Sequence, residues 1–225
     1  MNFRRSHHRD IAAILKALDN TFLSENRILF GGGTRIALEL DEFRESLDID
    51  LFCVGKAAYR AARSTVSNED FGKLFKPGQA PERYQGRDIR IDRDAIRSFL
   101  AADGGPIKLE IIHFDDQNIK ACEPDSRFPI PYVCRESCFA TKLLANADRY
   151  RDSSKDIVDL CMMKKHWGAP LPAAWESAFS HYGRDTVTRG LERALMGLVA
   201  KPAKSIAGLV SALSIDENLA EEIVK

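Results

Sequence analysis

The sequence of 225 residues lacks the features that mark a membrane-spanning or exported protein. No apolar run approaches the roughly 18 residues that a helix needs to cross a bilayer. The first ten residues, MNFRRSHHRD, are basic but lack the apolar core of a signal peptide. We therefore expect a cytoplasmic protein that has no membrane partner.

The sequence also lacks net charge, because 33 basic residues balance 33 acidic residues. A domain that binds nucleic acid usually carries an excess of positive charge, and this global footprint is absent. The balance does not exclude a polynucleotide partner, since a local basic face would suffice for binding.

The number of cysteines is odd: five residues in a chain without an export signal. Reduced and mostly buried thiols are the expected state. One alternative is a zinc site, because Cys134-x3-Cys138 is followed by Cys161-x4-His166. These spacings fit the usual paired knuckles poorly, and two of the cysteines fall in helical apolar patterns, so zinc is the weaker interpretation.

The first half of the chain alternates between helical and extended hydrophobic patterns. A helix is predicted for 10–23, a strand for 27–30, a turn for the glycines at 31–33, a helix from Thr34 to 40, a strand for 47–54, a helix for 56–67, and strands for 87–91 and 107–114. The stretch 68–86, rich in proline and glycine, is predicted to be an exposed excursion.

The second half is helical in pattern throughout. Helices are predicted for 135–149, 155–166, 172–181, 185–200, 203–213 and 216–224. The segment Glu123–Pro131 holds three prolines and marks a domain boundary. We therefore expect an α/β (α+β) catalytic domain with a mixed sheet at 1–134 and a helical bundle at 135–225.

Two aspartates stand two residues apart at the start of the strand predicted for 47–54. Because side chains alternate along a strand, Asp48 and Asp50 project from one face and Ile49 turns into the core. Adjacent carboxylates repel each other unless a cation lies between them, and hard ions such as Mg²⁺ or Mn²⁺ prefer oxygen ligands. The pair therefore predicts a catalytic metal site with Asp48 and Asp50 as ligands.

The glycine run at 31–33 supplies the elements of a phosphate-binding turn. Glycines let the main chain approach a triphosphate closely, and the N–H groups that begin the next helix donate to anionic oxygens. We expect Gly32, Gly33 and the Thr34 hydroxyl to bind a nucleoside triphosphate (NTP). A metal bridging its phosphates to the two aspartates would permit in-line attack on the α-phosphate. The glycine run or the aspartate pair alone is weak evidence for a site of phosphate chemistry, but the two motifs in this order are specific evidence for it.

A third carboxylate usually completes a two-metal site, and Glu110 is the best candidate. It lies in the otherwise apolar strand predicted for 107–114, where an unpaired carboxylate would be costly. Asp92 and Asp94 are weaker candidates, because the arginines beside them would form ordinary surface pairs. We expect Glu110 to be a catalytic residue and a metal ligand, and a purely structural strand acid is the alternative.

The segment LFGGGTRIALELDEFRESLDIDLF at 29–52 closely resembles the signature of the AbiEii/AbiGii-type nucleotidyltransferases. These enzymes are the toxin components of abortive-infection and toxin–antitoxin systems. They belong to the polymerase β superfamily, whose pattern is a Gly-Gly/Ser turn followed by Asp-x-Asp or Asp-x-Glu. The resemblance covers roughly 25–165 and implies a polymerase β-like core.

This family also carries a helical lysine and, downstream, an Arg/Lys-Asp-x-x-Asp-Leu motif. The chain matches with Lys142 in FATKLLA and with KDIVDL at 155–160. The resemblance implies that Lys142 contacts the NTP or the leaving pyrophosphate, and that Asp156 orients this lysine or accepts a proton. The alternatives are a purely structural salt bridge between the two and, for Asp159, an acid on a solvated helix face.

The resemblance implies a nucleotidyltransferase that moves a nucleoside monophosphate from an NTP to an RNA (tRNA included) or to a protein, with an antitoxin as partner. One alternative is a small-molecule acceptor, as in aminoglycoside-type transfer. Another is an inert module of the same fold that binds a nucleotide or a partner. A metal-dependent phosphohydrolase is disfavoured, because no histidine lies close to the acids in the sequence.

Overall fold

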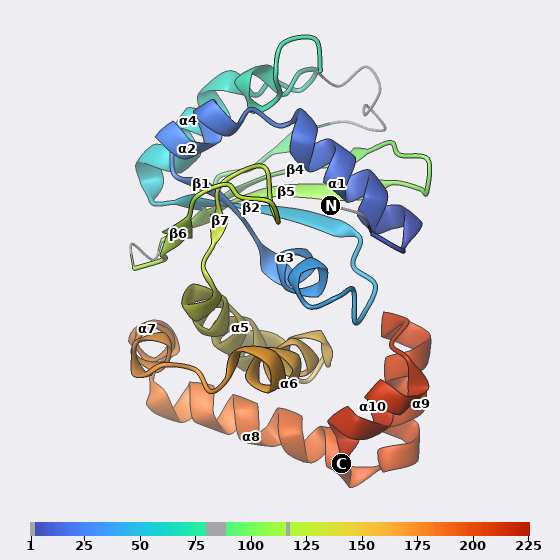
Figure 1. Cartoon of the computed structure of the whole chain (residues 1–225). Helices are drawn as coiled ribbons and strands as arrows, with labels where there is room; N and C mark the ends of the chain where they lie inside the picture. The colour runs from blue at the N-terminus through green and yellow to red at the C-terminus, as the bar shows by residue number, and fades with distance from the viewer. Residues whose placement is uncertain (1–2, 80–88, 116–117) are drawn as a thin grey trace. The chain divides into compact units, whose positions relative to one another are not determined.

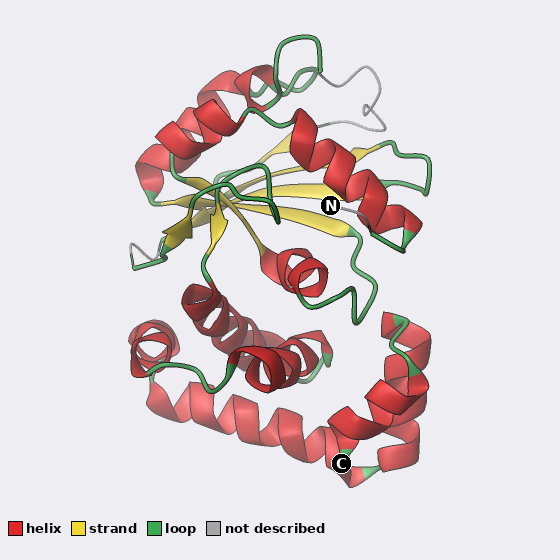
Figure 2. Ribbon diagram, viewed as in Figure 1, coloured by secondary structure: helices red, strands yellow, loops and turns green. Residues whose placement is uncertain are grey.

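The computed structural model describes residues 3–79, 89–115 and 118–225. These residues form a mixed sheet of seven strands and ten α-helices, so the expected α/β (α+β) fold is confirmed (Figures 1 and 2). The chain divides into two compact units. Unit 1 comprises 1–35 and 46–134, and unit 2 comprises 36–45 and 135–225. The proposed folding domains 1–134 and 135–225 stay a prediction.

Unit 1 contains the whole sheet, whose strand order is β3-β4-β5-β2-β1-β7-β6. The strands are β1 (Ile28–Gly31), β2 (Asp48–Val54), β3 (Arg90–Ile91), β4 (Ala95–Leu100), β5 (Ile107–Phe114), β6 (Ala121–Cys122) and β7 (Tyr132–Val133). Its helices are α1 (Ser6–Ala17), α2 (Asn20–Glu25), α4 (Lys56–Thr65) and the short 3-10 helix η1 (Gly72–Leu74). Figure 1 shows α1, α2 and α4 along one face of the sheet.

Strand β2 lies in the middle of the sheet, antiparallel to β1 and parallel to β5. Its residues Ile49, Leu51 and Cys53 are fully buried, which is typical of a strand face that packs against helices. Asp48 and Asp50 point to the opposite face and are only half-buried. The alternation predicted from the sequence therefore places the two carboxylates on the same side of the strand, opposite to Ile49.

Two local predictions for unit 1 are wrong. The single helix predicted for 10–23 is broken, because Leu18 forms a β-bridge with Phe75 and Asp19 caps the start of α2 by accepting a hydrogen bond from the Phe22 N–H. Strand β4 and the short strands β6 and β7 were not predicted. The excursion predicted to be exposed at 68–86 is wrong in its described part, because Phe71, Leu74 and Phe75 are buried. Residues 80–86 of that stretch and 87–88 of the strand predicted for 87–91 lie outside the described residues.

Unit 2 is helical, and the six helices predicted after residue 134 are all present within one or two residues. They are α5 (Arg135–Arg149), α6 (Lys155–Trp167), α7 (Pro172–Tyr182), α8 (Arg184–Ala200), α9 (Pro202–Leu213) and α10 (Glu217–Val224). Prolines at the first helical position open α7 and α9, as their fixed φ favours. Helix α3 (Gly32–Glu39) spans the division between the units.

Helix α5 is central to unit 2, where it packs against α6, α7 and α8. Gly190 of α8 comes so close to Ala147 of α5 that a Cβ there would lie 3.0 Å from the Ala147 Cα. In the part of the chain that the structure describes, no single helix has the length and hydropathy of a membrane span. The bent pair α8–α9 meets that criterion only when both helices are taken together.

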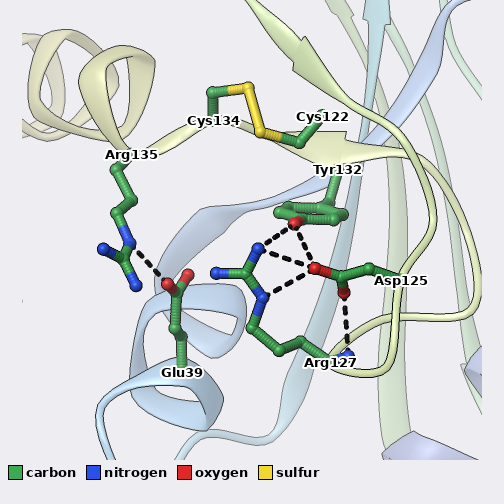
Figure 3. The surroundings of a disulfide bond; sticks show 7 residues. All are labelled: Glu39, Cys122, Asp125, Arg127, Tyr132, Cys134 and Arg135. Carbon is green, nitrogen blue, oxygen red and sulfur yellow. Dashed lines mark hydrogen bonds and ion pairs between the residues drawn. A yellow bond between two sulfur atoms is a disulfide. The ribbon is translucent and has the colours of Figure 1, made fainter.

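The prediction of reduced thiols is wrong for two of the five cysteines, because Cys122 and Cys134 form a disulfide (Figure 3). Strands β6 and β7 are antiparallel, and they bring the two Cα atoms to 5.2 Å. The pairing also removes Cys134 from the zinc alternative. Cys53 and Cys138 are buried and do not take part in the disulfide, and burial raises the pKa of Cys53 to about 12.

Polar side chains order the loop that this disulfide closes. Arg127 donates from Nε to an Asp125 carboxylate oxygen at 2.8 Å, and the Tyr132 hydroxyl donates to the same carboxylate at 3.0 Å (Figure 3). Burial raises the pKa of Asp125, but hydrogen bonds from Arg127, Phe128 and Tyr132 outweigh that effect and lower it to about 2. The loop is therefore held by both covalent and polar contacts.

Candidate active site

Asp48 and Asp50 lie on one face of β2, at the end of the strand that follows the loop 41–46. The register places Asp50 opposite Gly31 of β1 on one side and beside Glu110 of β5 on the other. Gly31, Asp50 and Glu110 therefore form one row across three neighbouring strands. Within unit 1, the glycine turn therefore lies beside Asp50, and Asp50 lies beside Glu110.

The glycine turn is pressed against the Asp50 carboxylate. Gly32 has a φ of +70°, and a Cβ added to it would lie 1.8 Å from the Asp50 Oδ2 atom. A Cβ at Gly31 would lie 2.6 Å from the Phe52 ring. Gly32 is therefore needed for its left-handed backbone and for the close approach to Asp50, whereas a side chain at Gly31 would displace the Phe52 ring.

Thr34 lies in the first turn of α3 and is fully buried. Its hydroxyl donates a short hydrogen bond to the main-chain carbonyl of Asp48, and the Ser46 hydroxyl lies 2.7 Å away. This hydroxyl therefore ties the start of α3 to the start of β2. The predicted NTP contacts of Gly32, Gly33 and Thr34 stay a prediction, and for Thr34 they depend on its main-chain N–H.

Glu110 lies next to Asp50, but cations hold both of its carboxylate oxygens. Arg97 donates from Nε to Oε1 at 2.9 Å, and Lys108 donates from Nζ to Oε2 at 2.7 Å. Burial raises the pKa of Glu110, but the hydrogen bonds and charges of Lys108 and Arg97 outweigh it and lower the pKa below its ordinary value. In residues 3–79, 89–115 and 118–225, no three acidic, histidine or cysteine side chains gather around one point. A third metal ligand at Glu110 stays a prediction.

The weaker candidates form surface pairs. Arg97 donates from a terminal nitrogen to Asp92 at 2.7 Å, and both side chains are largely exposed. Arg93 lies 3.8 Å from Asp94, also at the surface. Neither acid is placed in the row that holds Asp50.

In unit 2, Lys142 of α5 lies between two acids of α6. Its Nζ atom is 2.8 Å from Asp156 Oδ1 and 2.7 Å from Asp159 Oδ2. All three side chains are buried, with 5% of Lys142, 1% of Asp156 and none of Asp159 exposed. The inter-helix salt bridge that the sequence offered as an alternative is therefore present. A contact of Lys142 with the NTP stays a prediction.

Two arginines extend this group into a chain of ion pairs. Arg44 donates from Nε and a terminal nitrogen to both oxygens of Asp159, at 2.7 and 2.9 Å. Arg149 donates in the same manner to Asp156, at 2.7 and 3.1 Å. Asp159 is thus not an acid on a solvated helix face, and that alternative is wrong. Arg44 was not among the predicted site residues, because in the sequence it is only a basic residue in a polar loop.

The pKa values show what Asp156 can do chemically. Burial raises the pKa of Asp156, but the charge of Lys142 and the hydrogen bonds from Arg149 and Lys142 lower it to about 2. Burial lowers the pKa of Lys142, and the charges of Asp159 and Asp156 more than reverse this. A general base works best with a pKa near the working pH. Asp156 is therefore suited to orienting Lys142 and poorly suited to accepting a proton.

The family model described as the nucleotidyl transferase AbiEii toxin, Type IV toxin–antitoxin system, matches residues 13–223. This match spans nearly the whole chain, so the protein belongs to the AbiEii nucleotidyltransferase family. The class that fold and family define is a nucleotidyltransferase, as the glycine turn and the Asp48–Asp50 pair predicted.

Two solved structures share the fold. One is a candidate nucleotidyltransferase from H. pylori, with a TM-score of 0.52 and 18% identity over 97% of this chain and 89% of that chain. The other is JHP933 from Helicobacter pylori, with a TM-score of 0.53 and 16% identity over 99% of this chain and 90% of that chain. Among curated proteins, none matches the sequence.

Proposed function

We propose that the protein transfers a nucleoside monophosphate from an NTP to an RNA acceptor, in a metal-dependent reaction at Asp48 and Asp50. One observation carries this proposal: the main chain of a glycine turn lies against a carboxylate that shares its strand face with a second carboxylate. That arrangement places N–H donors for phosphates beside oxygen ligands for a cation.

The residues fit a bound Mg²⁺ or Mn²⁺. Mg²⁺ is commonly held by one or two carboxylates together with substrate phosphates, and Asp48 and Asp50 supply such a pair. Glu110 is the proposed third carboxylate: each of its oxygens accepts one hydrogen bond from a cation, which leaves a second lone pair for the metal. A metal held by these carboxylates would supply positive charge to neutralise the phosphates and the attacking oxygen.

The other residues bind and orient the NTP. The N–H groups of Gly32, Gly33 and Thr34 are proposed to donate to its phosphate oxygens. Lys142 is proposed to neutralise charge on the leaving pyrophosphate, and Asp156 to hold its ammonium group in place. The support for Lys142 is the family motif and its two buried acidic partners.

The family supports a toxin role, because its description names the toxin of a Type IV toxin–antitoxin system. We infer that the protein acts in the cytoplasm on an RNA (tRNA included) and that an antitoxin counteracts it. A protein or a small-molecule acceptor is the competing outcome of the test below.

The test is incubation of the pure protein with each labelled NTP, Mg²⁺ and total RNA, followed by separation of RNA, protein and small molecules. We expect label in the RNA, which chelation of the metal abolishes. Label in a protein or a small molecule but not in RNA, or in no fraction with any NTP, would contradict the proposal. An Asp103→Asn variant, changed at an exposed loop acid, serves as the control.

The role of Glu110 needs a separate test. Glu110→Gln should slow transfer on the order of 10²-fold, comparable with the loss of a positioned electrostatic group. NTP binding should be less affected. Normal turnover in a protein with reduced stability would instead identify Glu110 as a structural strand acid that holds Arg97 and Lys108.

A further inference from the structure

Next to the two aspartates, the same face of the sheet carries an exposed aromatic ring. The register aligns Asp48 of β2 with Lys108 of β5, and Lys108 with Phe99 of β4. Residues aligned in this way lie on one face of a sheet. Phe99 is therefore two strands from Asp48, or about 10 Å at the usual strand spacing.

A second row runs beside the first and carries arginines. It passes from Asp50 to Glu110, Arg97 and Arg90, on β2, β5, β4 and β3. The ion pairs of Glu110 with Arg97 and Lys108 confirm that these side chains share the face. We call the four residues Arg90, Arg97, Phe99 and Lys108 the β3–β5 strip.

The exposure of Phe99 fits a binding surface. Along β4, Ile96, Ser98 and Leu100 are buried, whereas Arg97 and Phe99 are exposed, the latter by 40%. A single exposed apolar residue is common and by itself indicates nothing. This ring, however, stands among three cations and in one row with Asp48. Aromatic rings among cations on an open sheet face are what single-stranded nucleic acids bind.

We propose that the β3–β5 strip binds the unpaired end of the acceptor RNA, an inference that rests on the proposed function. Phe99 stacks on a base, and Arg90, Arg97 and Lys108 pair with backbone phosphates. The charge of the strip is complementary to the phosphates of RNA. Its three cations outnumber the two carboxylates that pair with them, Glu110 and Asp92. Because an aromatic ring can stack on any base, the strip should bind RNA of many sequences. The strip also extends over three strands, a longer surface than a small-molecule acceptor would occupy.

The test measures the fluorescence anisotropy of a labelled, short single-stranded RNA of mixed sequence, without NTP or metal. Phe99→Ala should weaken binding roughly tenfold, and Phe99→Trp should restore it, because stacking needs only a ring. Leu195→Ala is the matched control, since Leu195 on α8 is similarly exposed, by 42%. Arg90→Gln should lower the slope of log affinity against log salt concentration by about 0.7, the value for one phosphate contact on a single strand.

Equal affinity of the wild-type and Phe99→Ala proteins, or equal weakening by Leu195→Ala, would overturn the assignment. So would a wild-type protein that labels a protein acceptor and binds no RNA. Failure of the proposed function is distinguishable, because it appears in the transfer assay as the absence of label in RNA, whereas failure of the strip assignment alone leaves RNA labelled by the wild type. The anisotropy assay requires no turnover.

Discussion

Asp48 and Asp50 in unit 1 and Asp156 and Asp159 in unit 2 are both pairs of acids close together in sequence, but their surroundings differ. The first pair is half-buried on one strand face beside a glycine turn. The second pair is buried, and Arg44, Lys142 and Arg149 supply its counter-charge. Removing one partner from a buried group of charges is costly for the fold, whereas half-buried acids next to a phosphate-binding turn suit a metal and a substrate.

The largest effect should come from unit 1. Asp48→Asn or Asp50→Asn should abolish transfer, because either change removes a metal ligand. The thermal unfolding midpoint should stay unchanged or rise, since repulsion between two carboxylates is relieved. Transfer assays and melting curves of both variants check this, with Asp103→Asn as control. Full activity in either variant would contradict the proposed site.

Removal of Lys142 should act on stability as well as rate. Lys142→Ala leaves Asp156 and Asp159 buried with less counter-charge, which typically costs about 3–5 kcal/mol of the free energy of unfolding. Lys142→Arg should rescue turnover only in part, because a planar guanidinium does not replace a compact ammonium. Denaturant titration and turnover of Lys142→Ala, Asp156→Ala and the double variant separate the roles. Normal turnover in a destabilised Lys142→Ala protein would remove this residue from the active site.

The disulfide of unit 1 should contribute somewhat less to the free energy of unfolding than Lys142 does. Cys122 and Cys134 are 12 residues apart in sequence, and closing a loop of about this length stabilises a fold by roughly 3 kcal/mol in the chain-entropy model. Reduction with a dithiol should therefore lower the unfolding midpoint of the wild type but not of Cys122→Ser. Identical shifts in the two proteins would show that the bond does not form in solution.

The smallest of these effects should be a dependence of stability on acid pH in unit 2. The pKa of Asp156 is lowered from 3.8 to about 2 in the folded state. Its stabilisation, about 2 kcal/mol, is therefore complete above pH 4 and lost as the pH falls toward 2. Urea titrations across this range should show a shallower loss for Asp156→Asn than for the wild type. If the stabilities of the wild type and Asp156→Asn changed in parallel with pH, the ion pairs of Asp156 with Lys142 and Arg149 would be contradicted.

The sequence was sufficient to predict those structural features that depend only on residues close together in the chain. Alternation along β2 placed Asp48 and Asp50 on one face, and the glycine turn had to precede a helix. The helices after residue 134 were also predictable, because a 3.6-residue apolar period lies within each segment and prolines open two of them.

The remaining features depend on contacts between distant residues. Nothing near Arg44 indicates that Asp159, 115 residues later, will neutralise it. The disulfide depends on the pairing of β6 with β7, two strands of two residues each that carry too little pattern to predict. The exposure of Phe99 likewise follows from the register of β4 against β5, which the sequence of β4 alone does not determine.

The Mg²⁺-dependent change in the thermal unfolding midpoint, measured with a non-hydrolysable NTP analogue, tests the central claim most directly. A ligand that binds only the folded state raises the midpoint with concentration. We expect Mg²⁺ to raise it for the wild type and for Asp103→Asn, but not for Asp48→Asn or Asp50→Asn. An equal rise in all four proteins would contradict the assignment of Asp48 and Asp50 as the metal ligands.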